Sequence, residues 1–298
     1  GVGPDSLVAV LGEREAALWT AVLGVLRAGG AYVPLDPAHP PARTAAILRG
    51  SGSRVLLASR ALEGQVESVL AGVEPAARPR VIRLDELWSG GVEEYVPSAA
   101  ERPDGRALAY VIYTCGSTGT PKGAMVEHAG MLNHLHAKVA DLALVPGDRV
   151  AQTASQCFDI SVWQLLSPLA VGARVHVFDD DVVHDPVRLL ERVEELGITV
   201  LEVVPSMLRA MLDAVEGGDV RPDLGRLRWL LVTGEALPPE LCRRSLQLFP
   251  RLPLLNAYGP TECSDDVTHH RVDAPPPGEH ARVPIGRAIA NTRLYVLD

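Results

Sequence analysis

The chain has 298 residues, 47% of them hydrophobic and 22% charged, which is the balance of a globular protein with one large core or two modest lobes. Its 28 basic and 37 acidic residues give a net charge of 28 − 37 = −9, and this excludes the basic surface that non-specific binding to nucleic acid or to anionic membranes requires. The four cysteines lack CxxC spacing, which argues against a zinc site or a disulfide framework and indicates a reducing cytoplasm. No apolar run approaches the ~20 residues of a membrane span, and no signal peptide is recognisable.

Apolar stretches typical of buried strands alternate along the chain with amphipathic stretches typical of helices. Strands are predicted at 6–12, 31–36, 54–59, 107–114, 172–179, 197–204 and 227–234. Helices are predicted at 14–30, 43–52, 186–196, 206–217 and 238–249. This alternation, with continuously apolar strands, predicts an α/β fold with mainly parallel, doubly wound sheets flanked by helices.

Residues 72–106 are rich in Pro, Arg, Glu and Gly, and we interpret them as a surface connection between two similar sub-lobes. The first sub-lobe is expected to contain 1–106 plus later strands, and the second 107–298. The chain begins at Gly1 and stops within a strand-like segment, 293–298, so we expect it to be a piece of a longer protein.

The segment YTCGSTGTPKG (113–123) follows a predicted strand and combines glycines, hydroxyl groups and Lys122. Successive backbone N–H groups in such a turn can form an anion nest, to which the hydroxyls and the lysine add donors. A Walker loop would need GxxxxGK[ST], but Pro121 stands before the lysine and Gly123 after it. The segment therefore predicts a phosphate-binding loop of another type, and the alternative is a flexible surface loop that binds nothing.

This loop resembles the phosphate loop of the adenylate-forming superfamily, and further motifs follow in the order of nonribosomal peptide synthetase adenylation domains. They are LRAGGAYVPLDPAHP (26–40), FDISVWQLLSPLAVGA (158–173), LLVTGEALP (230–238), NAYGPTE (256–262) and PIGRAIANTRLYVLD (284–298). YVPLDP and FDISVWQ are typical of the branch that activates amino acids. One departure is Cys115, where the family usually has serine, and its thiol is a weaker donor than a hydroxyl; the alternative is that a small side chain simply packs there.

The resemblance implies that an amino-acid carboxylate attacks the α-phosphate of ATP, giving an aminoacyl adenylate and pyrophosphate, with Mg²⁺ as cofactor. It implies catalytic roles for Thr118, Lys122 and Glu262, of which Glu262 would bind the metal. The phosphate-binding residues would be Thr114, Gly116, Ser117, Thr118, Gly119, Thr120 and Lys122. The adenine would contact Gly234, Glu235, Ala236, Asn256, Ala257 and Tyr258.

The resemblance also implies an amino-acid pocket. Its lining would be Asp159, Ile160, Trp163, Glu202, Leu231, Thr233, Ala257, Asp265 and Asp266, with Asp159 pairing with the substrate's α-ammonium. Asp159 could instead be only a helix N-cap. Glu202 lies in an otherwise apolar strand, and a buried carboxylate needs a partner.

Three acids favour a basic substrate, led by arginine or a cyclic guanidino amino acid such as capreomycidine, because a guanidinium fork can engage more than one carboxylate. Ornithine, lysine and diaminobutyrate follow, and Trp163 could add a cation–π face. Two alternatives stay open: Asp265 or Asp266 faces solvent, or Glu202 pairs with a protein arginine.

Two other functions compete with amino-acid activation: an acyl- or aryl-CoA ligase, and a nucleotide-binding core without turnover. The family's C-terminal subdomain, with its catalytic lysine, would follow residue 298, so we expect these residues alone to bind ATP or substrate and to adenylate slowly or not at all. The resemblance implies a phosphopantetheine-bearing carrier domain as partner and leaves an MbtH-like partner protein open. Nucleic acid and membranes are not expected partners.

Overall fold

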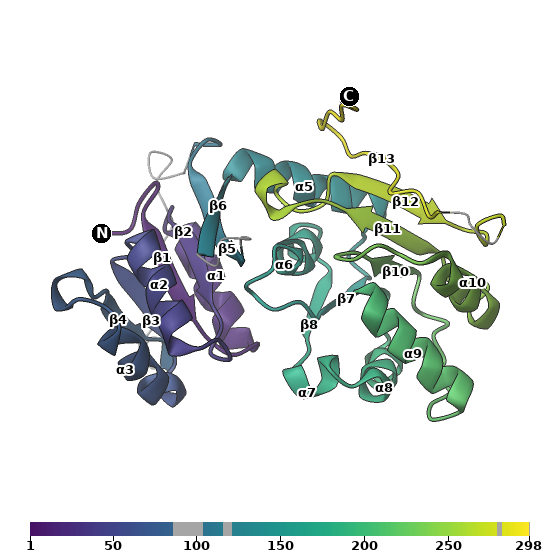
Figure 1. Cartoon of the computed structure of the whole chain (residues 1–298), viewed down its shortest axis with the longest axis horizontal. Coiled ribbons are helices and arrows are strands. Elements are labelled where there is room, and N and C mark those ends of the chain that lie inside the picture. The colour runs from purple at the N-terminus through teal and green to yellow at the C-terminus, as the bar shows by residue number, and fades with distance from the viewer. Residues whose placement is uncertain (86–103, 116–120, 279–281, 298) are drawn as a thin grey trace. The chain divides into compact units, whose positions relative to one another are not determined.

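The computed structural model contains two compact units, each built on its own sheet (Figure 1). The described residues are 1–85, 104–115, 121–278 and 282–297. Unit 1 comprises Gly1–Leu132 and Ser155–Asp159, and unit 2 comprises Asn133–Ala154 and Ile160–Asp298. Both sheets are mainly parallel and flanked by helices, which confirms the predicted fold class.

Unit 1 has a six-stranded sheet of order β4-β3-β1-β2-β5-β6, in which only the β5–β6 pair is antiparallel. Its strands are β1 (Leu7–Leu11), β2 (Ala31–Leu35), β3 (Val55–Ala58), β4 (Arg80–Arg83), β5 (Leu108–Cys115) and β6 (Pro121–Glu127). Its helices are α1 (Ala16–Arg27), α2 (Pro41–Ser51) and α3 (Glu63–Ala71), with short 3₁₀ turns at Arg60–Leu62 and Pro75–Ala77.

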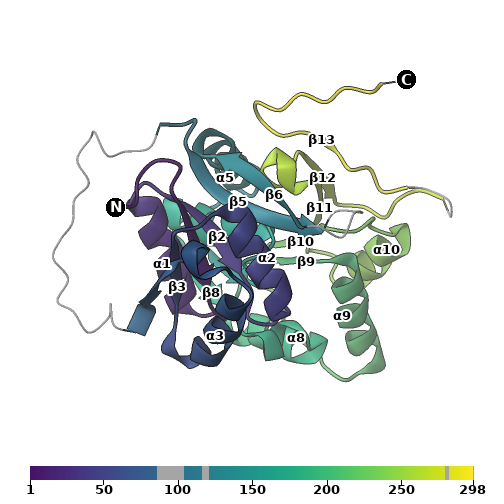
Figure 2. The same ribbon diagram turned by 60° about the vertical axis from the view of Figure 1, so that its left-hand side comes forward.

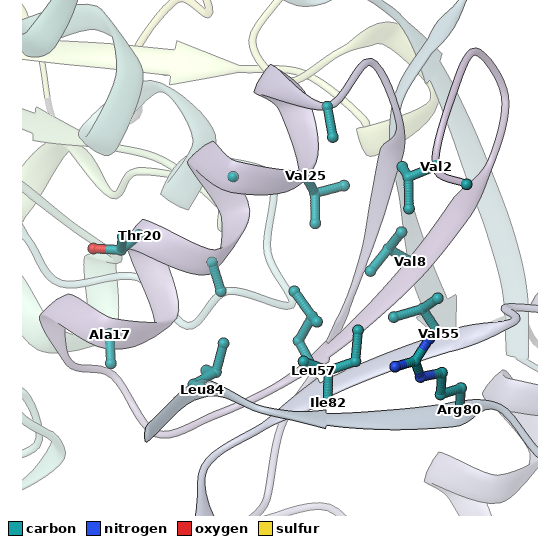
Figure 3. A pocket seen from close by; sticks show the side chains of 14 residues that line it. Val2, Val8, Ala17, Thr20, Val25, Val55, Leu57, Arg80, Ile82 and Leu84 are labelled. Atoms are coloured by element: carbon teal, nitrogen blue, oxygen red, sulfur yellow. The ribbon is translucent and has the colours of Figure 1, made fainter. Parts of the chain in front are cut away.

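The two faces of this sheet differ because successive side chains of a strand point to opposite sides. Ala9 and Leu56 belong to a core cluster together with apolar side chains of α2 and α3. On the other face, Val8 and Leu57 line a cavity of about 570 Å³ beside α1 (Figure 3). Its lining is aliphatic except for Thr20 and Arg80, so it offers little for phosphate or carboxylate chemistry.

Unit 2 has a seven-stranded sheet of order β13-β12-β11-β10-β9-β7-β8, parallel from β8 to β11 and antiparallel at β12 and β13. Its strands are β7 (Arg149–Gln152), β8 (Arg174–Val177), β9 (Val200–Val203), β10 (Trp229–Val232), β11 (Leu254–Tyr258), β12 (Thr268–Val272) and β13 (Arg287–Ala288). Its helices are α6 (Ile160–Ala170), α7 (Asp180–Val183), α8 (Pro186–Leu196), α9 (Pro205–Gly217) and α10 (Pro239–Leu248), with a 3₁₀ turn η4 at Thr261–Cys263. Helix α5 (His128–Asp141) begins in unit 1 and continues into unit 2.

Strand β9 shows how the faces of the second sheet are assigned. Leu201 and Val203 pack in a core cluster with side chains of α8, α9 and α10. Helix α8 contacts α9, and α9 contacts α10 (Figure 2). Glu202 points to the opposite face, where its carboxylate contacts side chains of α5 and α6. The apolar face therefore holds the sheet together, and the other face receives the polar groups.

The predicted strands and helices named above each coincide with an observed element, to within a few residues at the ends. The strand-like segment 293–298 is the exception: its described residues, 293–297, form no strand, and Tyr295 and Val296 are exposed. That prediction was wrong because an apolar stretch becomes a strand only when a neighbour pairs with its backbone. Of the predicted connection 72–106, residues 86–103 lie outside the described part, and β4 lies within the rest. No helix in the described residues is long and apolar enough to cross a membrane.

Candidate functional site

A cavity of about 650 Å³ opens in unit 2 where β10 and β11 end. Its lining comes from 234–239, 256–259 and residues 282, 283 and 285. It includes all six residues predicted to contact adenine: Gly234, Glu235, Ala236, Asn256, Ala257 and Tyr258. Carboxyl ends of parallel strands are where open α/β sheets bind ligands, so the fold gathers two distant sequence segments around one ligand-sized space.

Local geometry prepares this cavity for a planar, polar ligand. Gly234 follows β10 with a φ of 84°, a left-handed conformation that glycine adopts without strain. The Asn256 side chain is buried and its Nδ2 donates to the Pro284 carbonyl at 2.8 Å, which leaves Oδ1 as an acceptor. Tyr258 is half-exposed at the cavity wall and offers a ring face. An acceptor beside an exposed ring is what recognition of an aminopurine needs.

A cluster of buried acids lies on the α5/α6 side of the same sheet. Glu202, Asp265 and Asp266 are each no more than 3% exposed, so neither aspartate faces solvent. Trp163 Nε1 donates to Glu202 Oε2 at 2.7 Å. The Thr233 hydroxyl lies 3.0 Å from the Ala257 carbonyl and 3.3 Å from Asp266 Oδ1, which connects the cluster to the strand that lines the cavity.

Lys138 of α5 enters this cluster and is fully buried. Its Nζ lies 2.5 Å from Asp266 Oδ2, 3.8 Å from Glu202 Oε1 and 4.7 Å from the centre of a Trp163 ring. A cation was predicted to lie over the Trp163 ring, and in the structure this cation is a side chain of the protein itself, Lys138. Of the two open alternatives, solvent-facing aspartates are excluded, and Glu202 does pair with a protein cation, although with a lysine.

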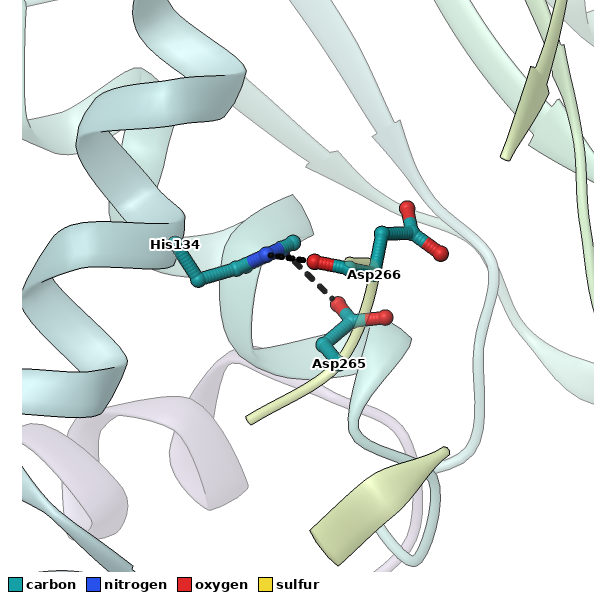
Figure 4. A group of neighbouring side chains, drawn as sticks. All are labelled: His134, Asp265 and Asp266. Atoms are coloured by element: carbon teal, nitrogen blue, oxygen red, sulfur yellow. Dashed lines mark hydrogen bonds and ion pairs between the residues drawn. The ribbon is translucent and has the colours of Figure 1, made fainter. Parts of the chain in front are cut away.

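Two histidines complete the cluster. His134 of α5 places Nε2 3.0 Å from Asp265 Oδ2 and Nδ1 3.4 Å from the Asp266 carbonyl (Figure 4). His269 of β12 bridges Asp141 Oδ2 at 2.7 Å and Asp266 Oδ2 at 3.5 Å.

The pKa shifts within the cluster follow from burial and from these pairings. Burial raises the pKa of Glu202, and Lys138 opposes that rise. Burial would also raise the pKa of Asp266, but attraction to Lys138 outweighs it and holds the pKa below its usual value. Burial lowers the pKa of His134 to about 4, so this imidazole is neutral at pH 7. His269 differs: burial would lower its pKa, but hydrogen bonds to Asp141 and Asp266 raise it.

The turn before these aspartates is tightly built. Ser264 and Asp265 have φ values of 69° and 85°, a strained conformation for residues other than glycine. A Cβ on Gly259 would meet the backbone oxygen of Asp265 at 2.0 Å, so only glycine allows this close approach. Backbone strain at a buried carboxylate indicates that its placement serves function.

His134, Asp265 and Asp266 also offer ligand atoms within 4.8 Å of one another, a spacing that could hold a metal ion. Figure 4 shows the Asp266 carboxylate pointing away from His134, and its Oδ2 lies against Lys138. The lysine charge disfavours a second cation there. We interpret the group as an ion-pair cluster, not as a metal centre.

The predicted phosphate loop is described only at its ends. Gly116, Ser117, Thr118, Gly119 and Thr120 lie outside the described residues. Thr114 and Lys122 face each other in the β5–β6 pair, with Thr114 Oγ1 3.5 Å from the Lys122 carbonyl, and the Lys122 side chain is exposed. Glu262 is exposed on η4, three residues beyond the cavity-lining Gly259. An exposed carboxylate next to a nucleotide-sized cavity suits Mg²⁺, which prefers one or two carboxylates plus phosphate oxygens and water.

The remaining predicted pocket residues are placed as follows. Leu231 is the register partner of Glu202 in β9 and is fully buried. Asp159 is buried and directly precedes α6, which begins at Ile160, but it belongs to unit 1. Eight of the nine predicted pocket residues thus lie in unit 2: Ile160, Trp163, Glu202, Leu231, Thr233, Ala257, Asp265 and Asp266.

Sequence reasoning missed the contribution of α5. A signal was present, because His134 and Lys138 are four residues apart and fall on the stripe that also carries buried Met131, Leu135 and Leu142. A lysine and a histidine in the buried stripe of a helix need buried partners. That pattern could have indicated a buried polar cluster but not its members.

Comparisons with known proteins identify the family of this chain. The family model described as AMP-binding enzyme matches residues 1–298. The chain is 41% identical over its whole length to phosphinothricin tripeptide synthetase PhsB of Streptomyces viridochromogenes, of which it covers 24%, and 34% identical to tyrocidine synthase 3 of Brevibacillus parabrevis, of which it covers 4%. It is also similar to a solved nonribosomal peptide synthetase, FmoA3, bound to alpha-methyl-L-serine-AMP, with a TM-score of 0.87, 31% identity, and coverage of 100% of this chain and 32% of that one. A form of the same protein bound to AMPPNP has a TM-score of 0.84.

The chain thus spans a quarter or less of the two curated relatives named. The resemblance to nonribosomal peptide synthetase adenylation domains is confirmed, and the predicted use of ATP with Mg²⁺ is confirmed at the level of the family. The family match covers every residue, so this chain belongs to the AMP-binding enzyme family.

Proposed function

We propose that this chain activates an amino acid as its aminoacyl adenylate for nonribosomal peptide synthesis. The observation that supports the proposal most is the joining of two sites on one sheet. Thr233 and Ala257, on adjacent strands, link a cavity with the predicted adenine residues to a buried cluster with the predicted amino-acid residues.

In the proposed reaction a carboxylate oxygen attacks the α-phosphorus, and the bond to pyrophosphate breaks. The protein must align two anions and stabilise the charge that develops between them. We assign alignment of the phosphates to the loop 113–123 with Lys122, and recognition of the base to Asn256 and Tyr258. Glu262 would hold Mg²⁺, which when bound neutralises phosphate charge. Asp159 keeps its predicted role at the α-ammonium, on motif resemblance.

We infer a basic side chain for the substrate from the charge of the cluster. Fully ionised, Glu202, Asp265 and Asp266 carry −3 and Lys138 adds +1, which leaves −3 + 1 = −2. Because burial raises the pKa of Glu202 to about 7, this carboxyl is only partly ionised at pH 7 until a cation lies beside it, and the charge of the cluster without that cation lies between −1 and −2. His134 is neutral, and the Asp141–His269 ion pair adds no net charge when His269 is protonated. A buried excess of negative charge favours a cation from the substrate. Arginine-like, cyclic guanidino and diamino acids all belong to this class.

A carrier domain with phosphopantetheine remains the proposed acceptor of the activated amino acid, an MbtH-like protein remains an open partner, and the cytoplasm remains the predicted compartment. The relatives named above are synthetases much longer than this chain, which is in keeping with further domains.

The decisive experiment is amino-acid-dependent exchange of pyrophosphate into ATP by the full-length protein. Basic amino acids should give the highest kcat/KM, and fatty or aryl acids none. Exchange that depends on fatty or aryl acids would instead support an acyl- or aryl-CoA ligase. ATP binding without exchange by any acid would support a nucleotide-binding core without turnover.

The basic preference is tested with Glu202→Gln. This change removes one negative charge from the cluster, so kcat/KM for the preferred basic amino acid should fall by about tenfold or more, as expected for a lost buried charge pair. Glu191→Gln, the same change at an exposed position of α8, is the control and should leave kcat/KM unchanged. An unaltered preference in Glu202→Gln would refute the basic pocket.

A further inference from the structure

Lys138 lies where the sequence argument placed the side-chain cation of the substrate. Its ammonium contacts the carboxylates of Asp266 and Glu202 and a ring face of Trp163. We propose that Lys138 is a specificity-determining residue. It occupies the Asp266 end of the acidic cluster and restricts the substrate to a short diamino acid. This inference rests on the proposed function and narrows its substrate class.

Moving Lys138 out of the cluster would cost free energy, because its charge is paired there. Its side chain is fully buried, and attraction to three acids raises its pKa although burial alone would lower it. It therefore stays charged, and a second cation beside Asp266 would meet a like charge at close range. A long basic side chain that reached Asp266 would have to displace this ammonium.

Glu202 supplies the acceptor that Lys138 leaves unused. Glu202 Oε2 accepts from Trp163 and, at 3.4 Å, from Gln164. Glu202 Oε1 is buried and makes no hydrogen bond with any described residue, and Lys138 Nζ at 3.8 Å is beyond hydrogen-bond distance. A buried carboxylate oxygen without a donor is the atom in this cluster that a ligand ammonium would complete.

The remaining acceptor of the cluster suits an ammonium better than a guanidinium. A guanidinium presents five donors in a rigid fork and is best satisfied by two carboxylates. Asp266 is already held by Lys138 and His269, and Asp265 Oδ2 lies 3.0 Å from His134 Nε2. The fork would therefore find Glu202 with only one oxygen available for it. An ammonium is a compact charge with three rotatable donors and suits such a site better. The geometry therefore favours a short diamino acid over the guanidino amino acids that sequence alone put first.

The test uses diamino acids whose side chains contain one, two, three or four methylene groups, in the pyrophosphate exchange assay with the full-length protein. The wild type should favour the shorter members over lysine by about tenfold or more in kcat/KM. Lys138→Met removes the internal ammonium and leaves Asp266 without its lysine partner, so kcat/KM for lysine should rise relative to the shortest members by about tenfold.

Two further variants separate charge from packing. Lys138→Arg keeps the positive charge and should keep the preference for short side chains. The double variant K138M/D266N removes both members of the Lys138–Asp266 ion pair together. No carboxylate is then left at the Asp266 end of the cluster, so the wild-type order of preference among the diamino acids should persist. It also avoids leaving the Asp266 carboxylate without its lysine partner, and so remains informative if K138M alone fails to fold.

The outcomes distinguish this inference from the proposed function. If no amino acid supports exchange, the proposed function fails and this inference fails with it. If basic amino acids support exchange but the wild type prefers lysine or arginine, only the role of Lys138 is overturned. The role of Lys138 is likewise overturned if folded K138M keeps the wild-type order of preference. It is also overturned if the preference of K138M/D266N for lysine rises by the tenfold expected of K138M.

Discussion

The two units use the same architecture, a mainly parallel sheet covered by helices, but they bury opposite kinds of side chain beside it. In unit 1 the space next to α1 is lined by Val8, Val25 and Leu57, with Thr20 and Arg80 as its polar side chains. In unit 2 the α5/α6 face of the sheet holds three acids and a lysine at no more than 3% exposure.

This difference shows that the sheet does not decide where chemistry occurs. Helix α1 brings small and aliphatic side chains to its sheet, whereas α5 brings His134 and Lys138 to the other. Burying charges is costly unless each is paired, and apolar side chains would fill the same space at lower cost. The buried charges of unit 2 are therefore in keeping with the ligand-binding role proposed above. The next three predictions test this contrast.

The largest expected effect is at Asp266. Asp266→Ala leaves the ammonium of Lys138 buried 3.8 Å from Glu202 Oε1, its other ion-pair partner, and should cost about 3–5 kcal/mol of unfolding free energy. Denaturant unfolding of the purified chain measures this. Asp273→Ala, which removes an exposed ion pair with Arg271, is the control and should cost less than about 1 kcal/mol. Equal losses in both variants would show that the buried cluster is no different from surface charge.

The next effect tests the aliphatic unit. Leu56→Ala empties a fully buried position against α2 and α3 and should cost about 2–5 kcal/mol. Leu57→Ala, the neighbouring residue on the cavity face, should cost less, because its side chain is only partly buried and borders an existing cavity. Both variants should keep the wild-type order of amino-acid preference, since neither residue is assigned to a ligand. A change in that order would contradict the separation of roles drawn between the two units.

The smallest effect is a dependence of stability on pH. Burial would lower the pKa of His269, but its hydrogen bonds to Asp141 and Asp266 raise it. A group whose pKa is raised on folding contributes stability that is fully present below its unfolded pKa of about 6.5 and is lost as pH rises through the folded pKa. The unfolding free energy should therefore decline as pH rises above about 6.5, and His269→Gln should reduce that slope. His270→Gln, on the opposite face of β12, should retain it.

The sequence by itself determined the regular elements and predicted which segments contact adenine. Strands such as 227–234 and helices such as 186–196 are set by local periodicity, and the structure places them within a few residues of the prediction. The adenine segments were identified by motifs, and parallel strand order brings them to one edge of the sheet. The stretch 293–297 failed as a strand because pairing depends on a neighbour that no local pattern supplies.

Only the tertiary structure decided how the acids are satisfied. The apolar strand around Glu202 already required a partner for its carboxylate, but periodicity could not identify Trp163 and Lys138 as those partners. Lys138 and Asp266 are 128 residues apart, and their contact depends on how α5 lies against the end of β11 and the turn that follows. The sequence thus predicted a group of neighbouring acids, and the fold decided that Lys138 neutralises part of their charge, because ion pairing acts through space and not along the chain.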